Sequence, residues 1–241
     1  MSRSGGSVVF TARVVLALAV LLPSLWLRLK FTRGDRASFL LVRQYARRML
    51  RFIGCRVDVQ HLERVPADGP LMFVANHISV ADAAVLIAVL PFDFRFVANH
   101  VYAAYPLLGV AIHGASASIV DRGSWRSRAD SGQAMVDTLA NGQSLLVFPE
   151  GTTADDGTML PFRSGAFRAA ARTRTAVVPI ALQGTREMMP ADRMLLAPAP
   201  IAIDVLAPIV PSDPTREGVA DLRERAAQAI RARLASSVTA S

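Results

Sequence analysis

The stretch Leu71-Met-Phe-Val-Ala-Asn-His-Ile-Ser-Val-Ala-Asp82 holds the change of pattern on which the fold depends. It opens with five apolar residues that end at Asn76, as expected for a strand buried on both faces of a sheet. A helical pattern follows over residues 81–90, and Pro91 ends it. A strand that passes directly into a helix is typical of α/β proteins, in which ligands bind where the strands end.

The same alternation of short apolar runs and helical patterns continues along the chain. Strands are predicted at 71–76, 94–98, 118–121, 145–148, 176–182 and 201–206, and helices at 81–90, 105–113, 126–140, 165–172 and 215–235. Pro179 predicts that the strand at 176–182 is an edge strand or carries a bulge. We therefore predict an α/β fold with a central, mostly parallel or mixed β-sheet flanked by helices.

The first 56 residues differ from the rest and predict a helical membrane-docking segment. Residues 14–27 carry no charge, but a helix of that length reaches only about 21 Å, against about 30 Å for a bilayer core. Three alternatives stay open, namely a re-entrant or interfacial anchor, a true span and a cleaved signal peptide. Residues 38–52 alternate apolar side chains with arginines, which indicates either a basic amphipathic helix on an anionic membrane or an ordinary surface helix, ended by Gly54.

Basic residues are dense after the uncharged stretch. Nine lie between Arg28 and Arg56, which by the positive-inside rule places the following domain on the cytoplasmic side of the inner membrane. We predict two parts, residues 1–56 as an N-terminal membrane-associating segment and residues 57–241 as one α/β domain. No internal repeat or low-complexity linker divides the second part further.

The net charge is +8, and almost all of the basic residues are arginine, since only Lys30 among the 27 is lysine. A GC-rich genome is the simple explanation, but arginine also suits phosphate and carboxylate groups of lipids or substrates. Few aromatic residues accompany the basic clusters, so we expect no nucleic-acid partner.

Cys55 is the sole cysteine, which excludes an intrachain disulfide and favours a small core residue over a nucleophile.

The first candidate site is Asn76-His77-Ile78-Ser79-Val80-Ala81-Asp82, where the buried strand gives way to a helix. His77 suits a general base near neutral pH, and Asp82 suits the acceptor of its other imidazole proton. Residues five apart on one helix point about 140° away from each other. The two side chains can meet only if His77 lies in the turn before the helix. The alternative is a capping histidine beside a solvated aspartate.

The second candidate site is Phe148-Pro149-Glu150-Gly151-Thr152, which also follows a buried strand. Glu150 places a charge at the mouth of the sheet, and Gly151 permits a turn open to a ligand. The alternative is a plain connection from strand to loop.

Together these motifs resemble the PlsC-type lysophosphatidic acid (1-acyl-sn-glycerol-3-phosphate) acyltransferase family. The family's Asn-His-x4-Asp block matches the first site and its Phe-Pro-Glu-Gly-Thr block matches the second. Three weaker matches complete the resemblance, which covers residues 71–185: Ile119-Val120-Asp121-Arg122, Phe162-Arg163-Ser164-Gly165 and Val178-Pro179-Ile180. In the first of these an isoleucine replaces the family's aromatic residue and Ser116 its glycine.

The resemblance implies a mechanism without an acyl-enzyme, in which His77 takes the proton of the acceptor hydroxyl and Asp82 orients His77. It implies that Arg122 and Arg163 hold the acceptor phosphate. The substrate-binding residues it suggests are Asn76, Arg122, Glu150, Gly151, Thr152 and Arg163. It implies no metal and no cofactor, and the chain contains no Gly-x-Ser-x-Gly elbow for a covalent route.

The expected activity is transfer of a fatty acyl group from acyl-CoA or acyl carrier protein to the free hydroxyl of a lysophospholipid. The acceptor implied is 1-acyl-sn-glycerol-3-phosphate, which gives phosphatidic acid, and membrane lipids are the expected surroundings. Residues 57–241 are then the acyltransferase catalytic domain. The alternatives are acylation of another lyso-lipid such as lyso-ornithine lipid, a thioesterase or lipid hydrolase that uses water, and a lipid-binding module without catalysis.

Overall fold

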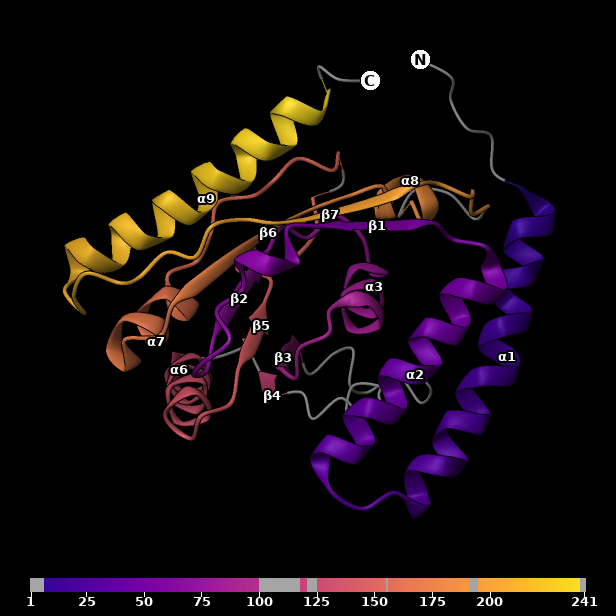
Figure 1. The fold of residues 1–241 in the computed structure, drawn as a ribbon, viewed down its shortest axis with the longest axis horizontal. Coiled ribbons are helices and arrows are strands. Elements are labelled where there is room, and N and C mark those ends of the chain that lie inside the picture. The colour runs from indigo at the N-terminus through magenta and orange to yellow at the C-terminus, as the bar shows by residue number, and fades with distance from the viewer. Residues whose placement is uncertain (1–6, 100–117, 121–124, 155, 191–194, 239–241) are drawn as a thin grey trace.

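The computed structural model describes residues 7–99, 118–120, 125–154, 156–190 and 195–238 (Figure 1). The strands are β1 Val57–Gln60, β2 Met72–Ala75, β3 Arg95–Asn99, β4 Ser118–Val120, β5 Leu145–Val147, β6 Val177–Gln183 and β7 Ile201–Val205. The helices are α1 Val8–Phe31, α2 Asp35–Ile53, a 3₁₀ turn at Leu62–Arg64, α3 Asp82–Val89, α6 Trp125–Ala140, α7 Gly165–Thr173, α8 Thr185–Met188 and α9 Arg216–Val238. The predicted helix at 105–113 lies outside the described residues.

The described strands form one sheet in the order β1-β7-β6-β2-β5-β3-β4. Strands β6, β2, β5, β3 and β4 pair in parallel, as predicted from the helices between them. The antiparallel pairing of β7 with β6 makes the sheet mixed, and β1 then pairs with β7 in parallel. The predicted α/β class with a mixed sheet is confirmed.

The edge-strand alternative predicted from Pro179 is wrong, because β6 is an inner strand between β2 and β7. The bulge alternative agrees with the pairing, which shifts by one residue between Ile180↔Val205 and Val177↔Ile209. The carbonyl of Pro179 accepts the amide hydrogen of Leu206, the residue directly after the end of β7. Pro179 has no amide hydrogen, and its partner Leu206 already lies beyond the last residue of β7. An inner strand tolerates proline at this position for that reason.

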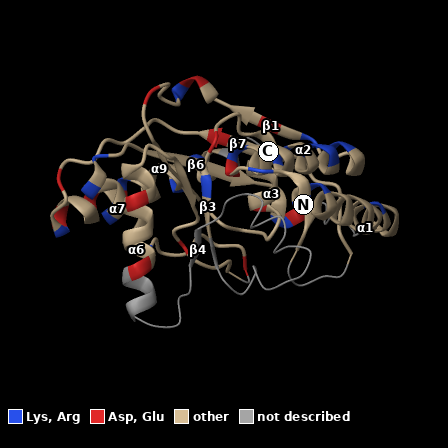
Figure 2. Cartoon of the chain, turned by 90° about the horizontal axis from the view of Figure 1, so that it is seen from below, with Lys and Arg blue, Asp and Glu red and all other residues tan. Residues whose placement is uncertain are grey.

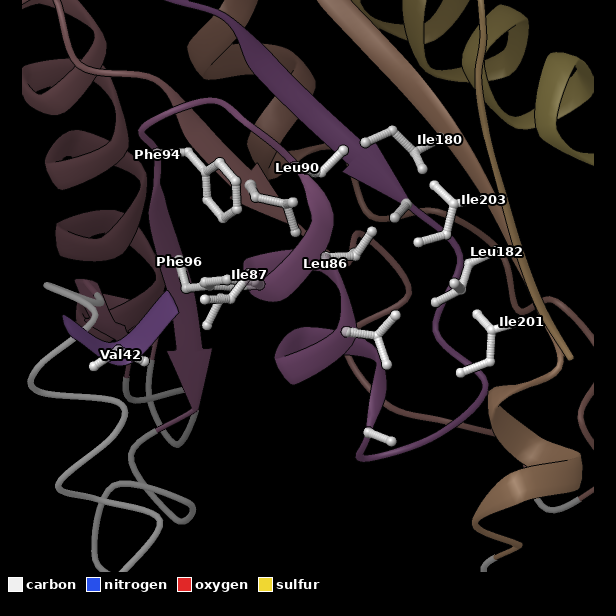
Figure 3. Close-up of a cluster of buried hydrophobic side chains, with 14 of the residues drawn as sticks. Val42, Leu86, Ile87, Leu90, Phe94, Phe96, Ile180, Leu182, Ile201 and Ile203 are labelled. Atoms are coloured by element: carbon white, nitrogen blue, oxygen red, sulfur yellow. The ribbon is translucent and has the colours of Figure 1, made fainter. Parts of the chain in front are cut away.

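Alternate residues of β2 enter two separate hydrophobic cores, as the two-residue period of a strand requires. Phe73 and Ala75 join a core shared with α1, α2 and α3, and part of that core is drawn in Figure 3. Met72 and Val74 join a second core shared with α6, α7 and α9. Both faces of the strand are therefore dry, which explains its unbroken apolar sequence. Cys55 packs half-buried against the first core.

Helices α1 and α2 form an antiparallel hairpin along one end of the molecule (Figure 1). The helix α1 has 24 residues and continues through Pro23, so it is longer than the uncharged stretch suggested. Gly54, with a φ of 73°, ends α2 in the left-handed conformation as predicted. Side chains of both helices join the core of the sheet. The division of the chain at residue 56 stays a prediction, and β1 begins at the next residue.

The outer side of α1 is strongly apolar. Its exposed residues include Val8, Val9, Val15, Leu16, Val20, Trp26, Leu27 and Phe31. By length and composition α1 is the one described helix able to cross a membrane. Basic residues lie along α2 beside it (Figure 2). An exposed apolar face next to arginines suits an anionic membrane surface.

Candidate active site

The two predicted sites meet at the carboxyl ends of three neighbouring parallel strands. The strand β2 lies between β5 and β6, so the segments that follow these strands lie at one edge of the sheet. They carry His77 after β2, Glu150 after β5 and Thr185 after β6. Strand ends of this kind form the ligand-binding edge of α/β sheets.

His77 and Asp82 form the pair that the sequence predicted. His77 lies in the turn before α3 and Asp82 is the first residue of that helix, with 2.8 Å between Nδ1 and Oδ2. The histidine can point back because it is not on the helix, as the 140° argument required. A carboxylate can only accept, so the proton of the neutral imidazole is on Nδ1. The other ring nitrogen, Nε2, is then a base, and none of the described residues is bonded to it.

The side chain of Asp82 is fully buried and held by four donors. Its Oδ2 also accepts the backbone N–H groups of Ile78 and Ser79, at 2.8 and 2.9 Å. Its Oδ1 accepts the hydroxyl of Thr185 at 2.5 Å. A buried carboxylate with this many donors keeps a fixed orientation towards the histidine.

The imidazole ring of His77 stacks on the ring of Phe148. The two centroids are 4.2 Å apart and the planes differ by 16°. The side chain of His77 keeps 17% of its surface exposed. The stack and the Asp82 bond together fix the ring so that Nε2 points away from Asp82, where a substrate hydroxyl can meet it.

Glu150 is buried, with 2% of its surface exposed, and it bonds to backbone groups rather than facing solvent. Its Oε1 accepts the backbone N–H of His77 at 2.7 Å, and its Oε2 accepts that of Leu160 at 2.6 Å. Burial raises the pKa of the Glu150 carboxyl above its ordinary value, although these bonds and the nearby His77 act against the shift. Both carboxylate oxygens therefore hold the loops around the base.

A family model described as acyltransferase matches residues 56–183, just over half of the chain. This chain belongs to the acyltransferase family. The match begins one residue before β1 and ends with β6, so it contains the His77–Asp82 pair and the Glu150 turn.

Several curated relatives resemble the acyltransferase over this region. A chloroplastic 1-acyl-sn-glycerol-3-phosphate acyltransferase of Brassica napus is 35% identical over 136 residues, 56% of this chain and 39% of that protein. A lyso-ornithine lipid O-acyltransferase of Pseudomonas aeruginosa is 34% identical over 121 residues, 50% of this chain and 46% of that protein. The aligned region is thus less than half the length of either relative.

A solved structure shares the fold of the acyltransferase along nearly its whole length. The crystal structure of the 1-acyl-sn-glycerophosphate acyltransferase PlsC from Thermotoga maritima superposes with a TM-score of 0.79. The two chains are 21% identical, and the match covers 97% of this chain and 96% of the other. The likeness therefore includes the N-terminal hairpin as well as the sheet.

The side chain of Asn76 bonds to the neighbouring strand, whereas the sequence suggested that it binds substrate. It is fully buried, and its side chain faces the backbone of Leu182 on β6. Its Nδ2 donates to the Leu182 carbonyl at 2.9 Å, and its Oδ1 accepts the Leu182 N–H at 2.8 Å. Asn76 thus extends the pairing of β2 with β6 by one residue, and both its polar atoms are used there.

Three other predicted residues lie on the segment that connects β5 to α7. Gly151 has a φ of 84°, which favours glycine, and the side chain of Thr152 is exposed. Arg163 is also exposed, and its Nε donates to the carbonyl of Glu150 at 3.2 Å. The substrate-binding role of Thr152 and Arg163 stays a prediction, and both side chains are exposed. Arg122 lies outside the described residues.

Thr185 is the site residue that the motifs missed. Its hydroxyl reaches Asp82 from 103 positions later in the sequence. The signal available was Gly184-Thr185 at the end of the strand next to β2, the same kind of place that drew attention to His77 and Glu150.

Among the described residues, no group of three or more His, Cys, Asp or Glu side chains is arranged to hold a metal ion.

Proposed function

We propose that this acyltransferase moves a fatty acyl group from a thioester, either acyl-CoA or acyl carrier protein, to the free hydroxyl of 1-acyl-sn-glycerol-3-phosphate. The product would be phosphatidic acid. The His77–Asp82 pair, with Nε2 available as a base at the edge of the sheet, is the observation that carries this proposal. The names of relatives such as the Brassica napus protein support the choice of acceptor.

In the proposed reaction Nε2 of His77 removes the proton of the acceptor hydroxyl while the hydroxyl oxygen attacks the thioester carbonyl carbon. The new C–O bond forms first, giving a tetrahedral intermediate, and the C–S bond then breaks. The thiolate that leaves takes the proton back from the imidazolium, so His77 is neutral again and no external reagent is needed. Asp82 stabilises the imidazolium between the two steps. Arg163, and Arg122 by resemblance, would hold the acceptor phosphate by charge-assisted bonds.

The test is a panel of lyso-lipids offered to the purified chain in detergent micelles with labelled oleoyl-CoA and, separately, oleoyl-acyl carrier protein. Conversion of lysophosphatidic acid into a diacyl product, in preference to the other acceptors, is the expected result. Preference for lyso-ornithine lipid, which the Pseudomonas aeruginosa relative is named for, would keep the chemistry and replace the acceptor. Free fatty acid without any acylated lipid would establish a hydrolase instead.

We also propose that the catalytic domain lies on the cytoplasmic face of the inner membrane with α1 flat on the surface. The N-terminal end of α1 is bonded to the domain, since Ser7 N–H donates to the Leu196 carbonyl at 2.8 Å and Leu196 N–H donates to Thr11 Oγ1 at 2.9 Å. Further along, Ser24 bonds to Tyr45 of α2 at 2.7 Å. A helix held in this way would have to leave the domain in order to cross the bilayer.

The helix α2, on which α1 rests, is itself bonded along its length to the domain. Asp35 at its start pairs with Arg95 of β3 at 2.5 Å, and Arg47 donates to the Ala88 carbonyl at the end of α3 at 2.6 Å. These contacts favour the interfacial alternative over the span. An N-terminal epitope should then be open to protease on the same side of the membrane as the catalytic domain, whereas a span would place it on the opposite side.

Replacing Val20 by Asp is expected to weaken sedimentation of the protein with anionic vesicles by about tenfold, because burying a valine side chain contributes about 1.5 kcal/mol or more. Val20 lies on α1 and is 58% exposed. Val210→Asp is the matched control, since Val210 is 67% exposed but lies on the loop before α9. Equal losses in the two variants would remove the support for docking through α1.

A further inference from the structure

The two oxygens of the Asp82 carboxylate have different partners. Oδ2 meets His77 and two backbone N–H groups, all of them within five positions of Asp82 in the chain. Oδ1 has a single described donor, the hydroxyl of Thr185 at 2.5 Å. Asp82 and Thr185 are both fully buried, so water has no access to replace that donor.

The backbone fixes where Thr185 lies. Gly184 precedes it with a φ of 90°, and a Cβ at that position would lie 2.0 Å from the carbonyl oxygen of Pro200. Only glycine fits this turn, which carries the chain from β6 into α8 directly beneath the segment entering β7. The close approach of Gly184 to Pro200 thus sets the course of the backbone that brings the Thr185 hydroxyl to Asp82.

We propose that Thr185 is a positioning residue for the acyl-transfer reaction, acting on His77 through Asp82. The proposal rests on the function proposed above. A carboxylate held only at Oδ2 can tilt about that oxygen, which turns the plane of the carboxylate relative to Nδ1 of His77. The Thr185 hydroxyl removes this freedom by holding Oδ1. Oδ2 then stays in line with Nδ1, and the imidazole keeps the orientation in which Nε2 meets the acceptor.

This role predicts an effect on the chemical step rather than on substrate binding. Thr185 is buried and its hydroxyl is bonded to Asp82, so we expect it to make no contact with either substrate. Loss of the hydroxyl would leave Oδ1 without a donor and misalign the base, which lowers kcat. The KM for the lyso-lipid and for the acyl donor should not change.

The experiment compares Thr185→Val, which keeps the shape and removes the hydroxyl, with Thr185→Ser, which keeps the hydroxyl. We expect Thr185→Val to lower kcat by about 10- to 50-fold with each KM within about twofold of wild type. Thr185→Ser should stay within about threefold of wild type in kcat. Should the valine variant fail to fold, Thr185→Ala takes its place in the same comparison with serine.

A second measurement separates positioning from a structural role. In the His77→Ala background Thr185→Val should cost no further activity, because the residue acts only through the base. A similar loss in that background, equal losses in valine and serine variants, or a raised KM at unchanged kcat would each overturn the proposal. An inactive wild-type enzyme would instead count against the proposed function, so the two failures can be told apart.

Discussion

Replacement of His77 by alanine is expected to lower kcat/KM for acyl transfer by about 10²- to 10⁴-fold, the range typical of a lost general base. Nδ1 of His77 lies 2.8 Å from Oδ2 of Asp82, so the other ring nitrogen, Nε2, is the one that can accept a proton. The acceptor hydroxyl is a poor nucleophile until its proton is removed. Initial rates with lysophosphatidic acid and oleoyl-CoA, measured over a range of each substrate, check the prediction.

His61→Ala is the matched control for this variant. His61 also bonds an aspartate through Nδ1, with 2.6 Å to Oδ1 of Asp204, but it lies beside β1 and β7 rather than at the ends of β2, β5 and β6. Its replacement should leave kcat/KM within about threefold of wild type. If His77→Ala kept activity within about fivefold of wild type, direct base catalysis by this residue would be excluded.

The parts of the fold predicted correctly are those in which local pattern and tertiary environment agree. The apolar run of β2 predicted a strand covered on both faces, and the structure places it between two cores. From the 140° between residues five apart on a helix, we expected His77 and Asp82 to meet only if His77 lay in the turn before the helix, and it lies there, 2.8 Å from Asp82. Both inferences use spacing along one short segment, where backbone geometry alone limits the possibilities.

The sequence could not reveal which way a polar side chain faces at the end of a strand. Asn76 and Glu150 were both expected to meet substrate, but Asn76 bonds the backbone of β6 and Glu150 bonds that of His77 and Leu160. A buried backbone N–H needs an acceptor as much as a ligand does. Which of the two the side chain serves depends on segments that the fold brings alongside.

Pro179 and Thr185 show the same limit for contacts between strands. The rule for proline in strands considers one strand, whereas the tolerance of Pro179 depends on where β7 ends. The Thr185 bond to Asp82 depends on β6 lying beside β2. Sheet order follows from the packing of all the helices together, so neither contact is visible in a local pattern.

Replacement of Glu150 by glutamine is expected to lower kcat/KM by about 10- to 150-fold at about pH 8, the range given by loss of one hydrogen bond to a charged group. Glutamine has one oxygen and one NH₂ group, so it can accept from His77 or from Leu160 but not from both. Its NH₂ group would face a backbone N–H, and the loop that carries the base would shift. Kinetics of the variant, with Asp156→Asn as an exposed control on the same loop, check this.

The difference in stability between wild type and Glu150→Gln should change with pH in the direction opposite to their ratio of activities. Burial raises the pKa of Glu150, so the folded protein loses stability, relative to an unfolded chain, as pH rises from the ordinary glutamate pKa through the raised value. Glutamine does not titrate and has no such loss. The melting temperature of wild type minus that of Glu150→Gln should therefore fall as pH rises above about 4.3, the ordinary glutamate pKa, while the activity ratio rises as the carboxylate forms. A difference in melting temperature that grew with pH would show that the two backbone bonds outweigh burial, and that Glu150 stabilises the fold as well as the base.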